Sequence, residues 1–293
     1  MYELTGQEGP LFQPIYNLIS TNQWVEMIVT TLIIFLQGFF INKLVMNHNF
    51  MRPPNFVTAF CFIILASLSV DFFGFSNVLM ANFFMLFAFN ELFLTFKLYR
   101  SAIHIFNAGF LMAIAALIYF PLFFIYFACS VTLLILRPYK IRERLQLLTG
   151  FVMPFYLICM WYYLKGNLTE FYTQFLQIQF TSLPFSLEAT AENLVYLFYL
   201  IIMLLVILSY RKLVSKKGLE IEKKIDALYW LCFFCFLTAY LSGPLSMPLL
   251  LVLAFPLSVL LAMFLVDIRQ KLISETLALG FLVYLFFIHF YLT

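Results

Sequence analysis

The chain has 293 residues, of which 64% are apolar, 20% are aromatic and only 11% are charged, with a formal net charge of +3. Soluble domains carry about 25% charged residues, so this chain lacks the polar side chains needed to cover a core of its size. The composition therefore excludes a soluble enzyme, a nucleic-acid-binding protein and a disordered regulator, and it indicates an integral membrane protein with the lipid bilayer as its surroundings.

The first 23 residues, 1–23, precede the first long apolar run. Leu11 to Ser20 is too short to cross a bilayer and contains Pro14, so we expect residues 1–23 to form an outer interfacial segment. The first 42 residues contain no Lys or Arg, and a cleavable signal peptide would need a basic start. The segment is therefore expected to stay attached.

Ten apolar runs follow in chain order, each close to the roughly 20 helical residues that a bilayer core requires. They are Trp24–Asn42, Phe56–Phe73, Asn77–Phe96, Ile103–Phe120, Pro121–Leu136, Leu145–Leu164, Leu194–Tyr210, Leu228–Gly243, Leu249–Val266 and Thr276–Leu292. We predict an all-α fold, a polytopic transmembrane helical bundle of about ten spans, which forms one integral membrane domain over residues 1–293.

The boundary between the fourth and fifth runs depends on one residue. The stretch from Ala102 to Leu136 has no Lys, Arg, Asp or Glu, and only Pro121 divides it. We interpret it as two short helices that meet at Pro121, because the residue before a proline avoids the helical conformation. The alternative is one long helix kinked at Pro121, which would reverse every later span.

The distribution of charge favours ten spans, because cytoplasmic loops retain Lys and Arg. With ten spans and an outside N-terminus, 16 of the 17 basic residues lie on the cytoplasmic side, and only Lys165 lies outside. The outer side instead carries Glu3, Glu8, Glu26, Asp71, Glu170, Glu188 and Glu192. We therefore expect both termini to lie outside.

Two longer polar segments connect the runs. Residues 165–193 have apolar residues at helical spacing with glutamines between them, which predicts an amphipathic helix in the outer interface. It would cap the bundle or form a lid over an outward cavity. Residues 211–226 form a charged cytoplasmic loop, which we expect to be a solvated helix extension or a docking segment for a partner protein or anionic lipid headgroups.

Ionisable residues within the runs are the first candidates for a site, because a charge in hydrocarbon costs at least about 2.5–3.5 kcal/mol. Glu26 and Asp71 lie at the outer ends of the first and second runs, and Asn77 and Asn82 lie in the third. If these helices are neighbours, Glu26 or Asp71 could act as a catalytic base and Asn77 and Asn82 could bind substrate. The alternative is that both acids lie in water at headgroup level.

A second candidate pair lies toward the cytoplasm. Glu91 lies deep enough in its helix to need a partner, and His104 at the start of the next run is the obvious one. The pair could relay protons or could be a satisfied contact between helices. The other histidines, His48 and His289, are interpreted as isolated.

The sequence predicts neither a metal nor a cofactor. Cys232 and Cys235 form a C-x-x-C, but this spacing within an apolar helix, without a second pair, is typical of packing. The chain also has no Walker loop, no G-x-S-x-G, no H-E-x-x-H and no dinucleotide fingerprint.

Several segments, in order, resemble an uncharacterised family of polytopic inner-membrane proteins from Bacteroidota. They include Gln37-Gly-Phe-Phe-Ile-Asn42, Leu79-Met-Ala-Asn-Phe-Phe84, Phe106-Asn-Ala-Gly-Phe110, Leu136-Arg-Pro-Tyr139, Gly150-Phe-Val-Met-Pro154 and Ala254-Phe-Pro-Leu-Ser258. The resemblance covers nearly the whole chain. It implies a multi-pass protein of the bacterial inner (cytoplasmic) membrane, and it implies no particular activity.

A more distant similarity is to multispanning glycosyltransferases that use polyprenyl-phosphate sugars. It is carried by residues 106–117, the basic loop that follows the next run, and Gly150-Phe-Val-Met-Pro154. It implies an acidic catalytic residue on the outer side, a role that only Asp71 or Glu26 could take. The chain departs from these enzymes in its outside start and its short first loop after a span, Asp71 to Ser76.

Three functions are compatible with these features. The first is a noncatalytic subunit or assembly factor of a cell-envelope complex, with other membrane proteins as partners. The second is a membrane enzyme of lipid-linked glycan metabolism that binds a polyprenyl phosphate or glycolipid. The third is a lipid or solute transporter coupled through Glu91 and His104.

Overall fold

The computed structural model describes residues 9–19, 22–51, 55–68, 74–167, 191–215, 217–241, 247–268 and 271–292. Within these residues every regular element is a helix and no strand occurs, which confirms the predicted all-α class. Asp71 and most of the expected outer amphipathic segment, residues 168–190, lie outside the described residues.

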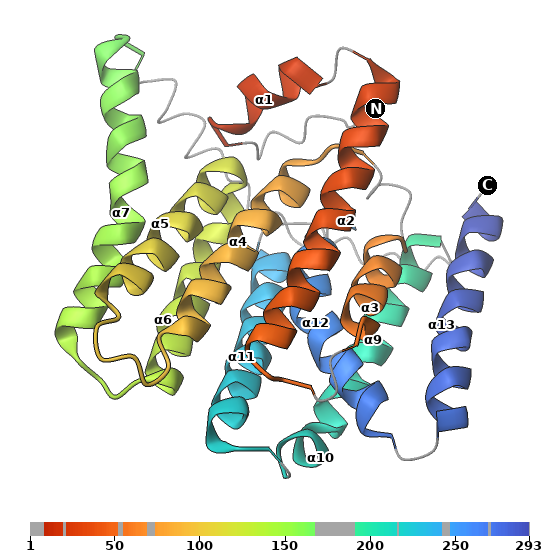
Figure 1. The fold of residues 1–293 in the computed structure, drawn as a ribbon. Coiled ribbons are helices and arrows are strands. Elements are labelled where there is room, and N and C mark those ends of the chain that lie inside the picture. The colour runs from red at the N-terminus through yellow and green to blue at the C-terminus, as the bar shows by residue number, and fades with distance from the viewer. Residues whose placement is uncertain are drawn as a thin grey trace.

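The helices run side by side in alternating directions (Figure 1). In chain order they are α1 (Phe12–Ile19), α2 (Gln23–Asn47), α3 (Val57–Ala66), α4 (Asn77–Leu94), α5 (Ala102–Ile118), the 3-10 helix η2 (Phe120–Phe124), α6 (Ile125–Leu136), α7 (Ile141–Leu164), α9 (Ala191–Leu208), α10 (Tyr210–Val214), α11 (Leu219–Leu241), α12 (Met247–Asp267) and α13 (Lys271–Leu292). Each of the ten predicted runs overlaps one of these helices. The middle of the bundle is α12, which packs against α3, α4, α9 and α11.

Four of the described helices are long and apolar enough to cross a membrane. They are α2, α4, α7 and residues Leu250–Asp267 of α12, and five shorter apolar helices accompany them. This is the pattern expected of an integral membrane protein. Ten crossings and outside termini stay predictions.

The stretch that Pro121 divides forms two helices. The first, α5, ends at Ile118, and Tyr119 is extended with φ −137° and ψ 106°. Pro121 then lies at the start of η2, where its missing N–H costs no helical hydrogen bond, and α6 begins at Ile125. Because α5 and α6 run in opposite directions (Figure 1), the prediction of two helices is confirmed.

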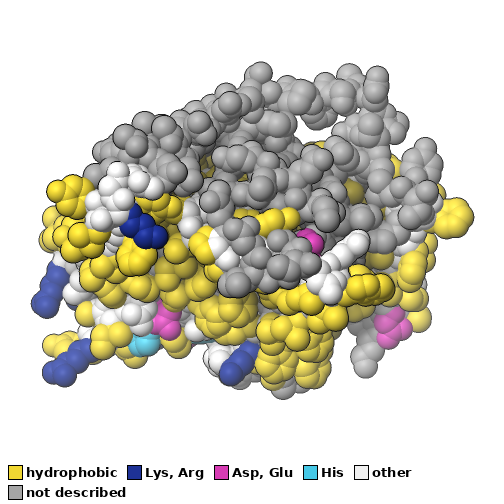
Figure 2. Space-filling view, turned by 90° about the horizontal axis from the view of Figure 1, so that it is seen from above, with side chains coloured by type: hydrophobic (Ala, Val, Ile, Leu, Met, Phe, Trp, Pro, Cys, Tyr) yellow, Lys and Arg dark blue, Asp and Glu magenta, His cyan; other side chains and the backbone are white. Residues whose placement is uncertain are grey.

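The bundle has two chemically different ends. We call the end that holds α1 the α1 end and the opposite one, which holds α10, the α10 end (Figure 1). The described Lys and Arg residues lie at or near helix termini of the α10 end, except Lys165, which follows the last residue of α7 at the α1 end. Seen from the α1 end, most described side chains are hydrophobic (Figure 2).

Glycines allow α5 and α7 to cross in close contact. A Cβ atom on Gly109 of α5 would overlap the carbonyl oxygen of Leu147, and one on Gly150 of α7 would overlap the carbonyl oxygen of Phe106. Small residues at such crossings are typical of membrane helix pairs, because they let the two backbones approach. The half of α7 at the α1 end leaves the bundle and stands at its edge (Figure 1). Pro154 lies within this helix.

Candidate functional site

Polar side chains of α2 form hydrogen bonds with α4, or with the residue just before it, at three levels of the bundle. We call this set of contacts the polar seam. Its α2 members are Glu26, Gln37 and His48, the last of which caps the C-terminus of α2. These positions are eleven residues apart, which is about three helical turns, so they lie on one face of the helix. Sequence reasoning missed this pattern, although the eleven-residue spacing indicates a polar face on α2.

The first level of the seam lies at the α1 end. Glu26 lies in the first turn of α2 and is only 8% exposed. Its Oε1 accepts a hydrogen bond of 3.2 Å from the backbone N–H of Phe75, directly before α4 begins. The Phe75 ring stacks on Phe12 of α1, with ring centroids 5.7 Å apart. Glu26 therefore fastens α2 to the residue before α4, and the ring of that residue, Phe75, packs against α1.

The second level lies in the middle of the bundle. Gln37 Nε2 donates to the carbonyl oxygen of Leu79 at 2.7 Å, and Asn82 Nδ2 donates to Gln37 Oε1 at 3.2 Å. Both side chains are fully buried. Among the described residues Asn82 Oδ1 has no partner. The pair thus resembles the polar contacts that hold membrane helices together.

The third level lies at the α10 end and includes a buried lysine. Lys224 of α11 is 1% exposed, and its Nζ lies 3.2 Å from His48 Nδ1 and 2.6 Å from Glu220 Oε1. An ammonium group can only donate, so His48 Nδ1 accepts and its Nε2–H donates to Asn90 Oδ1 at 3.3 Å. His48 is therefore neutral, and it joins α2, α4 and α11.

Two expectations from the sequence are wrong at this level. His48 is bonded on both ring nitrogens rather than isolated, and Lys224 is buried although it lies in the charged segment that was expected to be solvated. The reason is tertiary: the Lys224 side chain of α11 reaches His48 at the end of α2, and His48 in turn reaches Asn90 of α4. His48 and Lys224 are 176 positions apart in the sequence, so only the folded arrangement of the helices shows that they are in contact.

Burial and the neighbouring ammonium of Lys224 lower the pKa of His48 from 6.5 to about 4. An unfolded chain with the ordinary pKa takes up a proton before the folded chain does. His48 therefore contributes its full stability above pH 6.5, and this contribution is lost as the pH falls from 6.5 toward 4. The loss amounts to about 2 kcal/mol at pH 5.

Acidification is expected to lower the melting temperature of the detergent-solubilised protein between pH 7 and pH 5, and His48→Gln is expected to reduce this dependence. The glutamine amide can still donate to Asn90 and accept from Lys224, but it does not titrate. Melting curves of both proteins at several pH values test the prediction. Equal pH dependence of the two proteins would show that His48 is not the responsible group.

The predicted contact between Glu91 and His104 is present. His104 Nδ1 lies 2.8 Å from Glu91 Oε2, between α4 and α5, and both side chains are partly exposed. The contact joins two adjacent helices at the α10 end. The role in proton transfer stays a prediction.

Of the predicted outer residues that the structure describes, Glu26 and Asn82 lie at different levels of the bundle. Asn82 bonds to Gln37, which lies eleven residues beyond Glu26 along α2, or roughly 16 Å away at the helical rise. Asn77 is buried, and its Oδ1 accepts from the N–H of Val78 in its own helix at 2.8 Å. Asp71 lies outside the described residues. The catalytic and substrate-binding roles of these residues stay predictions.

A second buried polar cluster, which sequence reasoning also missed, surrounds Arg137. Its guanidinium donates to both carboxylate oxygens of Glu143, at 2.9 and 3.0 Å. Another nitrogen donates to the carbonyl oxygens of Thr95 and Leu98, each at 2.7 Å. Arg137 thus closes the end of α4 and links it to the start of α7, as basic side chains at helix C-termini commonly do.

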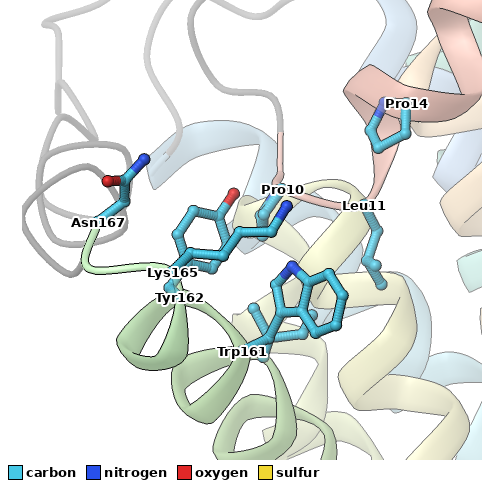
Figure 3. Close-up of a pocket in the computed structure, with 8 residues that line it drawn as sticks. Pro10, Leu11, Pro14, Trp161, Tyr162, Lys165 and Asn167 are labelled. Atoms are coloured by element: carbon cyan, nitrogen blue, oxygen red, sulfur yellow. The ribbon is translucent and has the colours of Figure 1, made fainter.

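One cavity of about 340 Å³ lies at the α1 end, between α1 and the last turns of α7 (Figure 3). It is lined by Pro10, Leu11, Pro14, Ile158, Trp161, Tyr162, Lys165 and Asn167. None of the predicted site residues that the structure describes lies in this lining. Within the described part of the chain, no three His, Cys, Asp or Glu side chains are placed to hold a metal ion.

Comparison with known proteins gave no match: no protein-family model fits the chain, and no curated protein or solved structure is similar to it. The function must therefore be inferred from the residues and their arrangement.

Proposed function

We propose that the protein is a noncatalytic integral subunit or assembly factor of a cell-envelope complex in the bacterial inner membrane, with about ten spans and both termini outside. The observation that carries this proposal is the use of the buried polar groups. Glu26, Gln37, His48 and Arg137 bind backbone or side-chain partners within the fold, so they stabilise helix contacts. Such internal use leaves them poorly placed to meet a substrate.

The spacing of the polar seam argues against a transporter. Its three levels are separated by roughly 16 Å each at the helical rise, and buried apolar residues such as Ile34, Ile41 and Leu44 lie on α2 between them. Two buried polar side chains also lie between the levels on α2, but Thr30 donates to the carbonyl oxygen of Glu26 and Asn42 donates to Met46 Sδ in the same helix. Neither of these hydrogen bonds links one level to the next. The seam therefore suits helix association better than transport.

The charge distribution supports the proposed orientation. Basic residues cluster at the α10 end: Lys43 lies near the end of α2, Lys97 follows α4, and Arg211 lies in the first turn of α10. Cytoplasmic loops retain such residues, so the α10 end faces the cytoplasm and the α1 end faces outward. The resemblance to inner-membrane proteins of Bacteroidota supports the same membrane.

The outer half of α7 is the edge that we assign to a partner helix. Beyond Pro154 it exposes Tyr156, Met160 and Tyr163, and Figure 1 shows this half of α7 at the edge of the bundle. Aromatic residues are enriched at protein interfaces, since they offer large contact areas at low entropic cost. A partner that packs here would complete the bundle at this edge.

Native mass spectrometry after gentle extraction from the natural membrane tests the proposal. We expect a stoichiometric protein partner that is lost from Tyr156→Ala/Met160→Ala and retained by the matched double variant Val283→Ala/Phe287→Ala, whose exposed residues lie on α13 at the opposite edge. A monomeric chain that carries a polyprenyl-phosphate sugar and no protein would contradict the proposal. That outcome would favour the second candidate.

The second candidate is a membrane enzyme of lipid-linked glycan metabolism, with Glu26 or Asp71 as its base and a polyprenyl phosphate or glycolipid as its substrate. The observation that favours it is the cavity at the α1 end, which lies at the same end as Glu26. The distant resemblance to glycosyltransferases supports it too.

Two substitutions at Glu26 separate a structural from a catalytic role. Glu26→Gln keeps an oxygen that can accept from the Phe75 N–H, so its melting temperature is expected to stay close to that of the natural protein. Glu26→Leu leaves this N–H unpaired and is expected to cost about 1–3 kcal/mol. If the Glu26→Gln protein is stable but fails to restore growth to a deletion strain, the carboxylate has a chemical role, and the second candidate gains support.

A further inference from the structure

The cavity at the α1 end has two walls of different origin. Pro10, Leu11 and Pro14 form the wall on the side of α1, and Ile158, Trp161 and Tyr162 come from the last turns of α7 (Figure 3). Lys165 and Asn167, just beyond α7, complete the lining. The volume of about 340 Å³ is within the usual range of small-ligand sites, about 300–1,000 Å³.

The α1 wall is held in place by its own contacts. The N–H of Gly9 donates to the carbonyl oxygen of Ile118 at 2.9 Å, and a Cβ atom on Gly9 would overlap the carbonyl oxygen of Leu117. Phe12 is fully buried against Phe75. These contacts join the start of the α1 segment to the end of α5 and to Phe75 before α4.

The α7 wall is also ordered, and it ends in a turn that presents Lys165. The N–H of Lys165 donates to the carbonyl oxygen of Trp161 at 3.2 Å, and Gly166 adopts φ +75°, which a glycine tolerates. Lys165 Nζ lies 4.8 Å from the centre of the Trp161 ring. The ammonium group is thereby held at the rim of the cavity.

Among the described residues, no carboxylate pairs with the Lys165 ammonium group. Within the described part of the chain it forms no ion pair, and it is the one Lys or Arg at the α1 end. Glu26, which lies at the same end, is buried and accepts a hydrogen bond from the N–H of Phe75. An exposed ammonium group above an apolar cavity attracts a ligand with an anionic head.

The surroundings of the cavity indicate the rest of the ligand. Leu11, Ile158 and the two prolines offer apolar contacts, and the neighbouring Tyr163 and Leu164 expose most of their side chains at the outer end of α7. Apolar walls with one cation at the rim suit an amphiphile better than a fully hydrated ion. Lys near a membrane surface gains about 1 kcal/mol from anionic lipid.

We propose that this cavity binds the phosphate-bearing head of an anionic membrane lipid, with Lys165 paired to the phosphate and with Leu11, Ile158 and Trp161 against the carbons next to it. Two lipids share this chemistry: an anionic phospholipid and a polyprenyl phosphate. The site is independent of whether the protein is a subunit or an enzyme.

Fluorescence of Trp161 provides a direct test. The chain has three tryptophans, so Trp24→Phe/Trp230→Phe leaves Trp161 as the sole reporter in the full-length protein. In bilayers of phosphatidylcholine, brominated phosphatidylglycerol is expected to reach half-maximal quenching at about fivefold lower mole fraction than brominated phosphatidylcholine. The added variant Lys165→Gln is expected to abolish this preference, and Lys165→Arg is expected to retain it.

Lys140→Gln is the matched control, because Lys140 is exposed at the α10 end and the substitution removes the same charge. It is expected to leave the preference unchanged. Equal quenching by the two brominated lipids, or an unchanged preference in Lys165→Gln, would overturn the proposal. If the tryptophan variant does not fold, lipid adducts of the otherwise natural protein and of Lys165→Gln are compared by native mass spectrometry, with the same expected preference.

Competitors identify the source of the phosphate. Displacement of brominated phosphatidylglycerol by polyprenyl phosphate at a lower mole fraction than by unlabelled phosphatidylglycerol would assign the site to a polyprenyl lipid. Equal displacement would assign it to phospholipid. Displacement by inorganic phosphate alone would show a site for a free anion and would contradict a lipid site.

Discussion

Gly109→Leu is expected to separate α5 from α7 and to cost at least about 3 kcal/mol of stability, the upper end of the usual range for overpacking. The reason is that the new side chain meets backbone. Its Cβ would overlap the carbonyl oxygen of Leu147, which cannot rotate away as a side chain can. Relief requires the two helices to move apart, and contacts along the whole crossing are then lost.

Gly109→Ala should have a smaller effect of the same sign, because its single methyl group still overlaps the α7 backbone. The matched control is Gly280→Leu on α13, since a side chain at this helical glycine enters open space. Melting temperature in detergent and the yield of monodisperse protein measure the effect. If Gly109→Leu and Gly280→Leu melted alike, the close crossing of α5 and α7 would be refuted.

The helices of this protein could be predicted from the sequence because their signals are local. Each apolar run and its flanking charges identify a helix without knowledge of its neighbours. Pro121 gave the boundary between α5 and α6 for the same reason, since proline restricts the residue before it. The contact between Glu91 and His104 was also within reach, because one short turn connects their helices.

The polar seam and the Arg137 cluster could not be predicted because their partners are distant in sequence. Lys224 lies 176 positions after His48 and is surrounded in sequence by charged residues, so its pattern is that of a solvated helix. The eleven-residue spacing of Glu26, Gln37 and His48 gives the face of α2 that is polar. It does not give the helix that this face meets.

The cavity was missed for a different reason. Lys165 is the one basic residue on the predicted outer side, but Trp161 and Tyr162 look like ordinary interfacial aromatic residues in the sequence, so no pattern indicates a site there. Pro10 and Leu11, which form the other wall, lie about 150 positions earlier in the sequence, just before α1. Only their placement beside α7 turns a lone cation into a lined site.

Arg137→Met is expected to destabilise the protein by about 3–5 kcal/mol, the usual cost of removing one partner from a buried ion pair. The substitution leaves the Glu143 carboxylate buried without its cation and also removes the donor of the Thr95 and Leu98 carbonyl oxygens. Arg137→Lys keeps the charge, but one ammonium group cannot replace a planar fork that binds four oxygens. The loss of stability in Arg137→Lys is expected to be smaller than that in Arg137→Met.

The double variant Arg137→Met/Glu143→Leu separates the two parts of this loss. It removes the unpaired carboxylate, so it should recover part of the stability, but the carbonyl oxygens at the end of α4 still lack their donor. We expect its melting temperature to lie between those of Arg137→Met and the natural protein. Arg142→Met is the matched control, because Arg142 is exposed in the first turn of α7. Equal melting temperatures for the single and double variants would mean that Glu143 finds another cation or becomes protonated, and that the carbonyl contacts of Arg137 carry the whole effect.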